Sequence, residues 1–173
     1  MNQHFQKLFF FVLISSFTSL VGAKTISDFP LIHEGYLPDL VIDTNDAEVV
    51  SIAANAFVHD ALLVSTNNPH IYNSIVKQKL DVAIIAGTLG KSQYIDDLAK
   101  HNKINVQSIQ GKWETFSFTF LGKPIKGVKR ALVIAGSDRR ATAYGIFELS
   151  RMIGVCRRGF GRPTCYLLPD KSL

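Results

Sequence analysis

The sequence predicts a mixed α/β (α+β) fold, in which helices pack on a β-sheet. Three observations lead to this prediction. Apolar runs that end at glycine or aspartate indicate buried strands. Between them, apolar residues recur every three or four positions, as on one face of a helix. A further stretch alternates strictly between apolar and polar residues, which is typical of an antiparallel strand with one face in water.

The first half of the chain predicts two strands with a long helix between them. Residues 37–43 are apolar and β-branched around a proline and predict a strand. The helix that follows is capped by Asn45 or Asp46 and ends before the break at residues 67–70. Residues 80–87 predict a strand covered on both faces. The spacing of the helix places these residues inward: Val49, Ile52, Ala53, Ala56, Phe57 and Leu63; Glu48, Asn55 and Asp60 face outward.

The second half predicts two helices and two strands. A short helix follows Ser92, its expected cap, and the alternating stretch around residues 115–120 is the antiparallel strand. Residues 128–136 predict another buried strand, and extra short strands are expected near residues 71–76 and 104–109. The last helix carries an apolar stripe formed by Ala143, Ile146, Phe147, Leu149 and Ile153.

The two ends of the chain have their own character. Residues 1–23 resemble a signal peptide, with Lys7, an apolar run and small residues up to Ala23, so we expect export to the periplasm or the extracellular space. That run is shorter than the about 20 apolar residues of a bilayer span and is interrupted by serines, so we expect no stable membrane anchor. We assign residues 24–155 to one α/β domain and residues 156–173 to a tail, which holds both cysteines.

The charge of the chain argues against nucleic acid as a partner. The formal net charge is +5, but three arginines and a lysine against one aspartate lie in the tail. The domain itself is nearly neutral and lacks the one-sided basic stripe that binding to a phosphate backbone requires.

Several motifs that suggest chemistry fail on their spacing. Residues 86–92, "AGTLGKS", have two residues between the glycines where a phosphate-binding loop needs four, so we expect a β-to-α turn. The histidines lack the spacing of metal ligands, and we expect neither a metal nor a cofactor. Trp113 with Phe116, Phe118 and Phe120 is compatible with a sugar-stacking platform, but period-two phenylalanines are more typical of a core.

The turn at residues 134–142 carries the candidate site of the chain: Ser137, Asp138, Arg139 and Arg140. A nucleophile elbow needs glycine where Arg139 stands, so Ser137 is not expected to be a nucleophile. Ser137 or Asp138 suits the N-cap of the last helix. The free N–H groups of that helix, with Arg139 and Arg140, are the alternative: a site for an anion or for contact with another domain. The sequence predicts no catalytic residue.

Two segments carry a resemblance to a known family. "GKWETFSF" and "ALVIAGSDRRATAYGIFELSRMIGV" resemble the signature near the end of the N-terminal domain of glycoside hydrolase family 115, the xylan α-1,2-glucuronidases. The match departs at Ala141, where the family prefers glycine. The resemblance implies a fold similar to the small domain that precedes the barrel in β-hexosaminidases and α-glucuronidases.

The resemblance also implies where the chemistry of the family lies. The catalytic carboxylates belong to a downstream (β/α)8 barrel, so Asp138, Glu114 and Glu148 inherit no catalytic role, and the barrel is the expected partner of the domain. The full-length family enzyme releases glucuronic or 4-O-methylglucuronic acid from xylan, whereas we expect this chain to be inactive alone. Whether the chain counts as an enzyme is left open.

The likeness ends at Val155, where the family continues with a tryptophan-rich segment. "RRGFG" in the tail corresponds to codons for that segment shifted by one base, so we hypothesise a frameshift or gene-model error. Two other functions stay open. One is a carbohydrate-binding or interaction module that binds xylan or glucuronoxylan. The other is the lead domain of another glycoside hydrolase, such as a β-hexosaminidase.

Overall fold

The computed structural model describes residues 35–74 and 79–155. The expected signal peptide and the tail lie outside these residues. Within them, eight elements follow one another: β1 (Asp39–Val41), α1 (Glu48–Val64), β2 (Ile71–Tyr72), β3 (Leu80–Thr88), α2 (Gln93–Lys100), β4 (Phe116–Gly122), β5 (Val128–Gly136) and α3 (Arg139–Met152). The predicted α/β class is confirmed.

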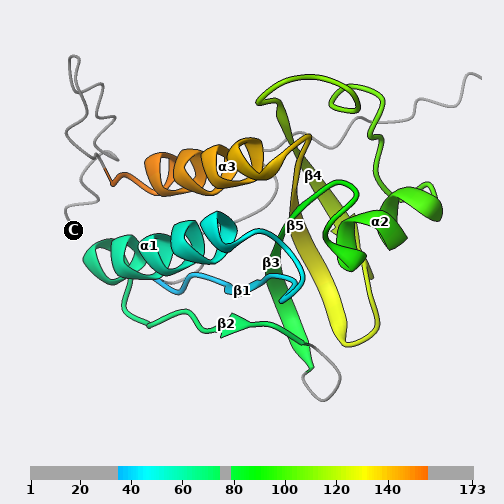
Figure 1. Ribbon diagram of the computed structural model, residues 1–173. Helices are drawn as coiled ribbons and strands as arrows, with labels where there is room; N and C mark the ends of the chain where they lie inside the picture. Colours follow the sequence, from blue (N-terminus) through cyan, green and yellow to red (C-terminus); the bar gives the residue numbers. More distant parts are fainter. Residues whose placement is uncertain (1–34, 75–78, 156–173) are drawn as a thin grey trace, which may run out of the picture.

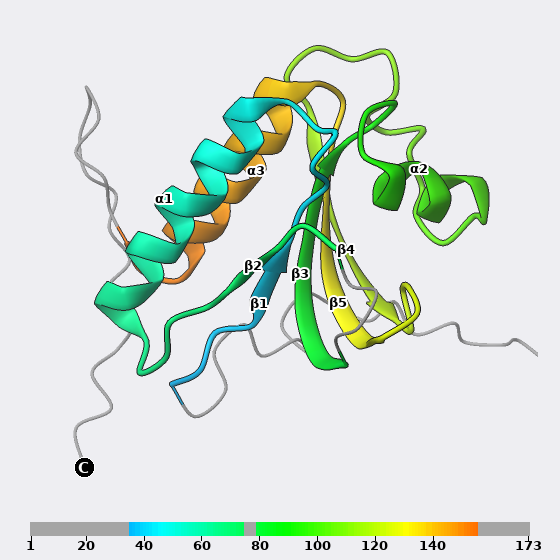
Figure 2. The same cartoon turned by 60° about the horizontal axis from the view of Figure 1, so that its bottom comes forward.

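The five strands form one sheet in the order β2-β1-β3-β5-β4. Strands β2, β1, β3 and β5 are parallel, and β4 pairs antiparallel with β5, with Phe118 opposite Ile134. Helices α1 and α3 lie side by side on one face of the sheet, and α2 covers the other face (Figures 1 and 2). The antiparallel strand predicted from the alternating stretch is thereby confirmed.

The two central strands separate two apolar cores. Alternate residues of a strand point to opposite faces, so Ile84 joins the core under α1 and α3, while Ile85 joins the core under α2. Both side chains are fully buried. The prediction that residues 80–87 form a strand covered on both faces is confirmed. No helix among the described residues is long and apolar enough to cross a membrane.

Helix α1 presents a different face to the core than its spacing predicts. Ile52 and Leu63, expected inward, are 57% and 67% exposed, and Asp60, expected outward, is 3% exposed. The residues that do face the core are Val50, Ala53, Ala54, Phe57, Asp60 and Ala61. This helix is apolar on more than one side, so its periodicity fits two orientations. The orientation with three alanines inward allows close packing on α3 and the sheet.

Three smaller expectations are also corrected. Phe147, expected in the core, is 37% exposed on α3. The N-cap of α1 is Ala47, without a side-chain cap bond, rather than Asn45 or Asp46. Residues 104–109 form turns rather than a strand, with Ile109 buried against the α2 core. The short strand expected near residue 71 is confirmed as β2.

Candidate functional site

The loops after β1, β3 and β5 meet at one edge of the sheet, where the parallel strands end (Figure 1). The chain leaves β1 toward the α1 face and leaves β3 toward the α2 face. In open α/β sheets, ligands usually bind at such a switch point, beyond the carboxyl ends of the strands. This carboxyl edge is therefore the first place to expect a binding site.

Two aspartates of the loop after β1 bind backbone N–H groups at this carboxyl edge. Asp43 accepts hydrogen bonds from the backbone N–H groups of Asn45 (2.8 Å) and Gln93 (2.6 Å). Asp46 accepts from those of Ala47 and Thr88, both at 2.7 Å. All four carboxylate oxygens are thus committed to the backbone, and they tie the β1 loop to the end of β3 and the start of α2.

The start of α2 shows how the fold replaces an expected cap. Ser92 is the N-cap of α2, as expected, but its side chain makes no cap bond and its hydroxyl is buried without a hydrogen-bond partner. The carboxylate of Asp43 accepts the N–H of Gln93 instead. The position of the cap is confirmed, whereas its expected hydrogen bond is wrong, and the charged acceptor at the start of α2 comes from another loop.

A buried polar chain links the loops after β3 and β5. The hydroxyl groups of Thr88 and Thr142 lie 2.8 Å apart, and the hydroxyl of Thr142 donates to the backbone carbonyl of Asp138 at 3.2 Å. A carbonyl only accepts, so Thr142 is the donor in that bond and Thr88 donates to Thr142. Together with the bond from the Thr88 N–H to Asp46, these hydrogen bonds connect the loop after β1 to the start of α3.

Asp138, one of the two residues that the sequence offers as the N-cap of α3, is the cap. One carboxylate oxygen accepts from the N–H groups of Arg140 and Ala141, both at 2.9 Å, and the other accepts from the N–H of Glu114 at 2.8 Å. Burial opposes ionisation of this carboxyl, but these bonds and that from the Ser137 hydroxyl outweigh it and hold the pKa of Asp138 below its ordinary value.

Ser137 and Arg140 join the loop before β4 to the start of α3. The hydroxyl of Ser137 accepts from the N–H of Thr115 at 3.1 Å, and the Ser137 N–H donates to the Thr115 carbonyl at 2.8 Å. Arg140 forms an ion pair with Glu114 at 2.9 Å and donates to the Tyr144 hydroxyl at 3.1 Å. Three of the four candidate residues are therefore in one network, while Arg139 is exposed at the first position of α3.

Trp113 lies on the loop that this network holds. Its side chain is 76% exposed, whereas Phe118 and Phe120 pack against the core under α1 and α3. Glu114, the next residue, has a φ of 49°, in the left-handed region that few residues other than glycine adopt. The sequence missed this separation of the aromatic residues, because it depends on where the strand begins.

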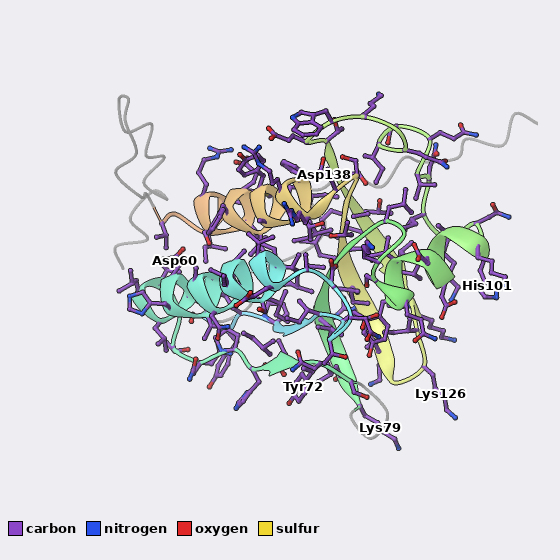
Figure 3. All side chains as sticks on the ribbon, viewed as in Figure 1. Asp60, Tyr72, Lys79, His101, Lys126 and Asp138 are labelled. Atoms are coloured by element: carbon purple, nitrogen blue, oxygen red, sulfur yellow. The ribbon has the colours of Figure 1, made fainter. Side chains whose placement is uncertain are left out.

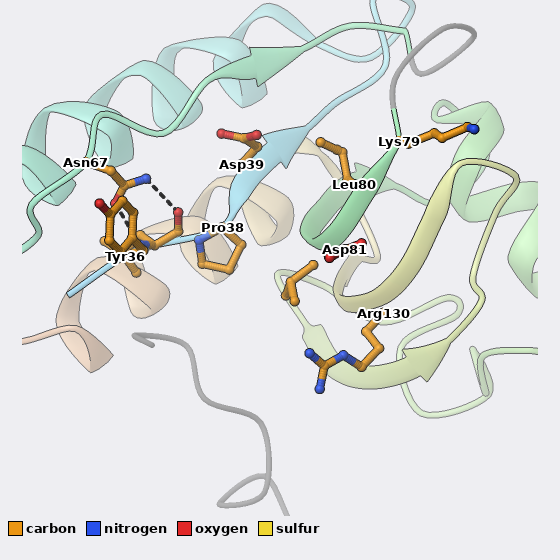
Figure 4. A pocket seen from close by; sticks show the side chains of 10 residues that line it. Tyr36, Pro38, Asp39, Asn67, Lys79, Leu80, Asp81 and Arg130 are labelled. Carbon is orange, nitrogen blue, oxygen red and sulfur yellow. Dashed lines mark hydrogen bonds between the residues drawn. The ribbon is translucent and has the colours of Figure 1, made fainter. Parts of the chain in front are cut away.

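The opposite edge of the sheet carries an open hollow of about 460 Å³ (Figure 4). It is lined by Tyr36, Pro38, Asn67, Lys79, Asp81 and Arg130, among others. Figure 3 shows Lys79 near this end of the sheet and Asp138 at the other. No motif predicted the hollow, because the starts of different strands line it.

Two polar side chains of this hollow, Asn67 and Asp81, are engaged with the chain itself. The side-chain amide of Asn67 bonds the backbone N–H and carbonyl of Leu37, at 2.8 and 2.9 Å. The hydrogen bond and charge of Lys129, 2.7 Å away, hold the pKa of Asp81 below its ordinary value. Among the described residues, no group of three histidine, cysteine or acidic side chains is placed to hold a metal ion.

Comparison with known proteins relates the chain to a glycoside hydrolase of known structure. No family model and no curated protein matches the chain. Among solved structures, it is similar to a family GH115 4-O-methyl-α-glucuronidase with specificity for decorated arabinogalactans, at 31% sequence identity and a TM-score of 0.50. The match covers 68% of this chain and 14% of that enzyme, so the chain spans a small part of its relative. The chain is therefore related, in sequence and in fold, to a GH115 α-glucuronidase.

Proposed function

We propose that this chain is the N-terminal, non-catalytic domain of a GH115 α-glucuronidase. In full length, such an enzyme hydrolyses α-1,2-linked glucuronic or 4-O-methylglucuronic acid from xylan. The support is the 31% identity over most of this chain with a small part of a GH115 enzyme, together with the two sequence segments that resemble the end of the N-terminal domain.

The observation that carries the non-catalytic role is the state of the carboxylates near the candidate site. Most glycoside hydrolases need a pair of carboxyl groups, one of them a general acid with a raised pKa. Here the pKa of Asp138 is lowered instead, and its carboxylate caps α3. A hydrogen bond from Arg151, 2.7 Å away, likewise lowers the pKa of Glu148. Glu114 is paired with Arg140. Asp138 and Glu148 are therefore not suited to protonate a glycosidic oxygen at neutral pH.

The remainder of the proposal concerns the ends of the chain. Export after cleavage near Ala23 and a shift of reading frame after Val155 both agree with the sequence. Reading the genomic DNA past Val155 tests the second point. A shifted frame that continues as a tryptophan-rich segment and a barrel supports it, and a frame without them contradicts it.

The activity assay uses the purified 173-residue chain on glucuronoxylan and on a decorated arabinogalactan, the substrate class named for the related enzyme. We expect no release of glucuronic or 4-O-methylglucuronic acid above a blank from the host. The repaired, full-length product is expected to release it from at least one of the two polymers. Release by the 173-residue chain itself would overturn the non-catalytic assignment.

A further inference from the structure

Four exposed side chains gather at the start of α3: Trp113, Arg140, Tyr144 and Phe147, called here the aromatic face. Arg140, Tyr144 and Phe147 are spaced by four and three residues and share one side of the helix. Trp113 lies on the loop beside the start of this helix, because the following residue, Glu114, pairs with Arg140. Trp113, Tyr144 and Phe147 are large apolar side chains, and 37% or more of each is exposed.

The backbone beside Trp113 and the pair formed by Arg140 and Tyr144 are held in place by the chain itself. The residues after Trp113 are tied to the α3 start by the bonds from Glu114 to Asp138 and from Thr115 to Ser137. The guanidinium of Arg140 donates to the Tyr144 hydroxyl and lies 5.9 Å from the centre of its ring. A surface with fixed side chains loses less conformational entropy on binding, which favours association.

The composition and shape of the face indicate a protein partner. Tyrosine, tryptophan, phenylalanine and arginine are the residues enriched at the centres of protein interfaces. Sites for sugars and other small ligands are concave, whereas the outer side of a helix is convex. The other exposed large apolar residues lie elsewhere: Ile52, Leu62, Leu63 and Val64 on α1 are aliphatic, and Tyr36 is a single aromatic residue before β1. They do not combine aromatic side chains with an arginine, as the aromatic face does.

We infer that the aromatic face is the docking surface for the larger body of a GH115-type hydrolase, an inference that rests on the proposed function. The match covers 14% of the related enzyme, in which the matching unit is therefore joined to a much larger polypeptide. Lys112 and Arg139 are exposed beside the face and add positive charge. The docking surface on the partner accordingly carries acidic side chains around an apolar centre.

The test uses the fact that Trp113 is the only tryptophan of the chain. The 173-residue chain is labelled with 5-fluorotryptophan and mixed with the polypeptide of the related GH115 enzyme made without its matching segment. We expect a complex by analytical ultracentrifugation and a shift of the single fluorine resonance. Tyr144→Ala should weaken the complex at least tenfold, whereas Ile52→Ala, a matched control at an exposed apolar site of α1, should leave it unchanged.

The outcomes separate this inference from the proposed function. The docking surface is overturned if a complex forms but the fluorine resonance does not shift and both variants weaken the complex equally. The proposed function then remains intact. No complex with a partner polypeptide that is itself folded overturns the docking surface, and the assay of the repaired gene product then decides the proposed function alone. A shift produced by glucuronoxylan oligosaccharides without the protein would assign the face to a glycan and also overturn the inference.

A second measurement covers a partner that does not fold by itself. The same variants are placed in a hybrid of the related enzyme that carries this chain in place of its own matching segment. Tyr144→Ala is expected to lower the unfolding temperature of the hybrid relative to Ile52→Ala. Equal unfolding temperatures would contradict docking through the aromatic face.

Discussion

The hydroxyl groups of Thr88 and Thr142 lie 2.8 Å apart inside the protein and join the end of β3 to the first turn of α3. Thr142 also donates to the carbonyl of Asp138, so the direction of both bonds is fixed. This pair spans 54 residues of sequence and fastens the end of β3 to the helix that follows its neighbour β5.

The two threonines are expected to respond differently to substitution. Thr142→Val leaves the buried Thr88 hydroxyl without an acceptor and should lower the free energy of unfolding by about 1–3 kcal/mol. Thr88→Val should cost less, because Thr142 keeps its bond to Asp138. The double variant should cost less than the sum of the two, as urea denaturation can measure. Thr44→Val, at an exposed site, is the control, and strict additivity would contradict the coupling.

Asp138→Ala removes the cap of α3 and the bond to Glu114, and it should lower the free energy of unfolding by about 1–2 kcal/mol. The native pKa of Asp138 is below its unfolded value, about 3.9. Its stabilisation is therefore present above pH about 4 and is lost as the pH falls through the native pKa. The difference between wild type and Asp138→Ala should shrink below pH about 4. Asp97→Asn, an exposed carboxylate on α2, is the control. A difference that grew with acid would refute the argument.

Gly136 ends β5 where the first turn of α3 passes over it. A methyl group there would lie 2.4 Å from the backbone nitrogen and 2.8 Å from the Cα of Thr142. Backbone cannot yield as a flexible side chain does, so Gly136→Ala should lower the free energy of unfolding by about 1–3 kcal/mol or more. Gly122→Ala, at the end of β4, meets no atom within 4 Å and should have a small effect. Equal losses in thermal unfolding would contradict the close approach.

The ion pair between Arg140 and Glu114 should matter more for order than for stability. The Arg140 side chain is about half exposed, so Arg140→Ala should change the free energy of unfolding by less than about 1 kcal/mol. The same change removes a link to the loop of Trp113, and the fluorescence anisotropy of this tryptophan should fall. Arg139→Ala, one residue earlier and exposed, is the control. An unchanged anisotropy would show that the backbone bonds alone hold the loop.

Sequence reasoning succeeded where the signal is local. The apolar runs of β3 and β5 and the cap at Asp138 each depend on residues within a few positions, and all three are confirmed. The inward face of α1 was wrong, because its apolar residues fit two orientations and only packing against α3 chooses between them. For α2 the position of the cap was right, but the hydrogen bond of the cap was wrong. The side chain that accepts the N–H of Gln93, Asp43, is 50 residues away in the sequence.

The candidate site shows the same division. Ser137, Asp138 and Arg140 were singled out from one turn, and the structure brings them into one network. Their partners Glu114 and Thr115 come from a different loop, and no spacing in the sequence relates the two segments. The exposure of Trp113, which lies before the start of β4, was not predictable from spacing either. A ligand or another domain at this site stays a prediction.

Strand β4 has a consequence for the behaviour of the isolated chain in concentrated solution. One edge of β4 pairs with β5, and no described strand pairs with the other. Its sequence, FSFTFLG, has no charge and no proline and is rich in aromatic residues, which is the composition of segments that add to one another edge to edge. The purified chain is therefore expected to aggregate on storage through pairing of β4 strands from different molecules. The substitution Ser117→Lys should delay this aggregation.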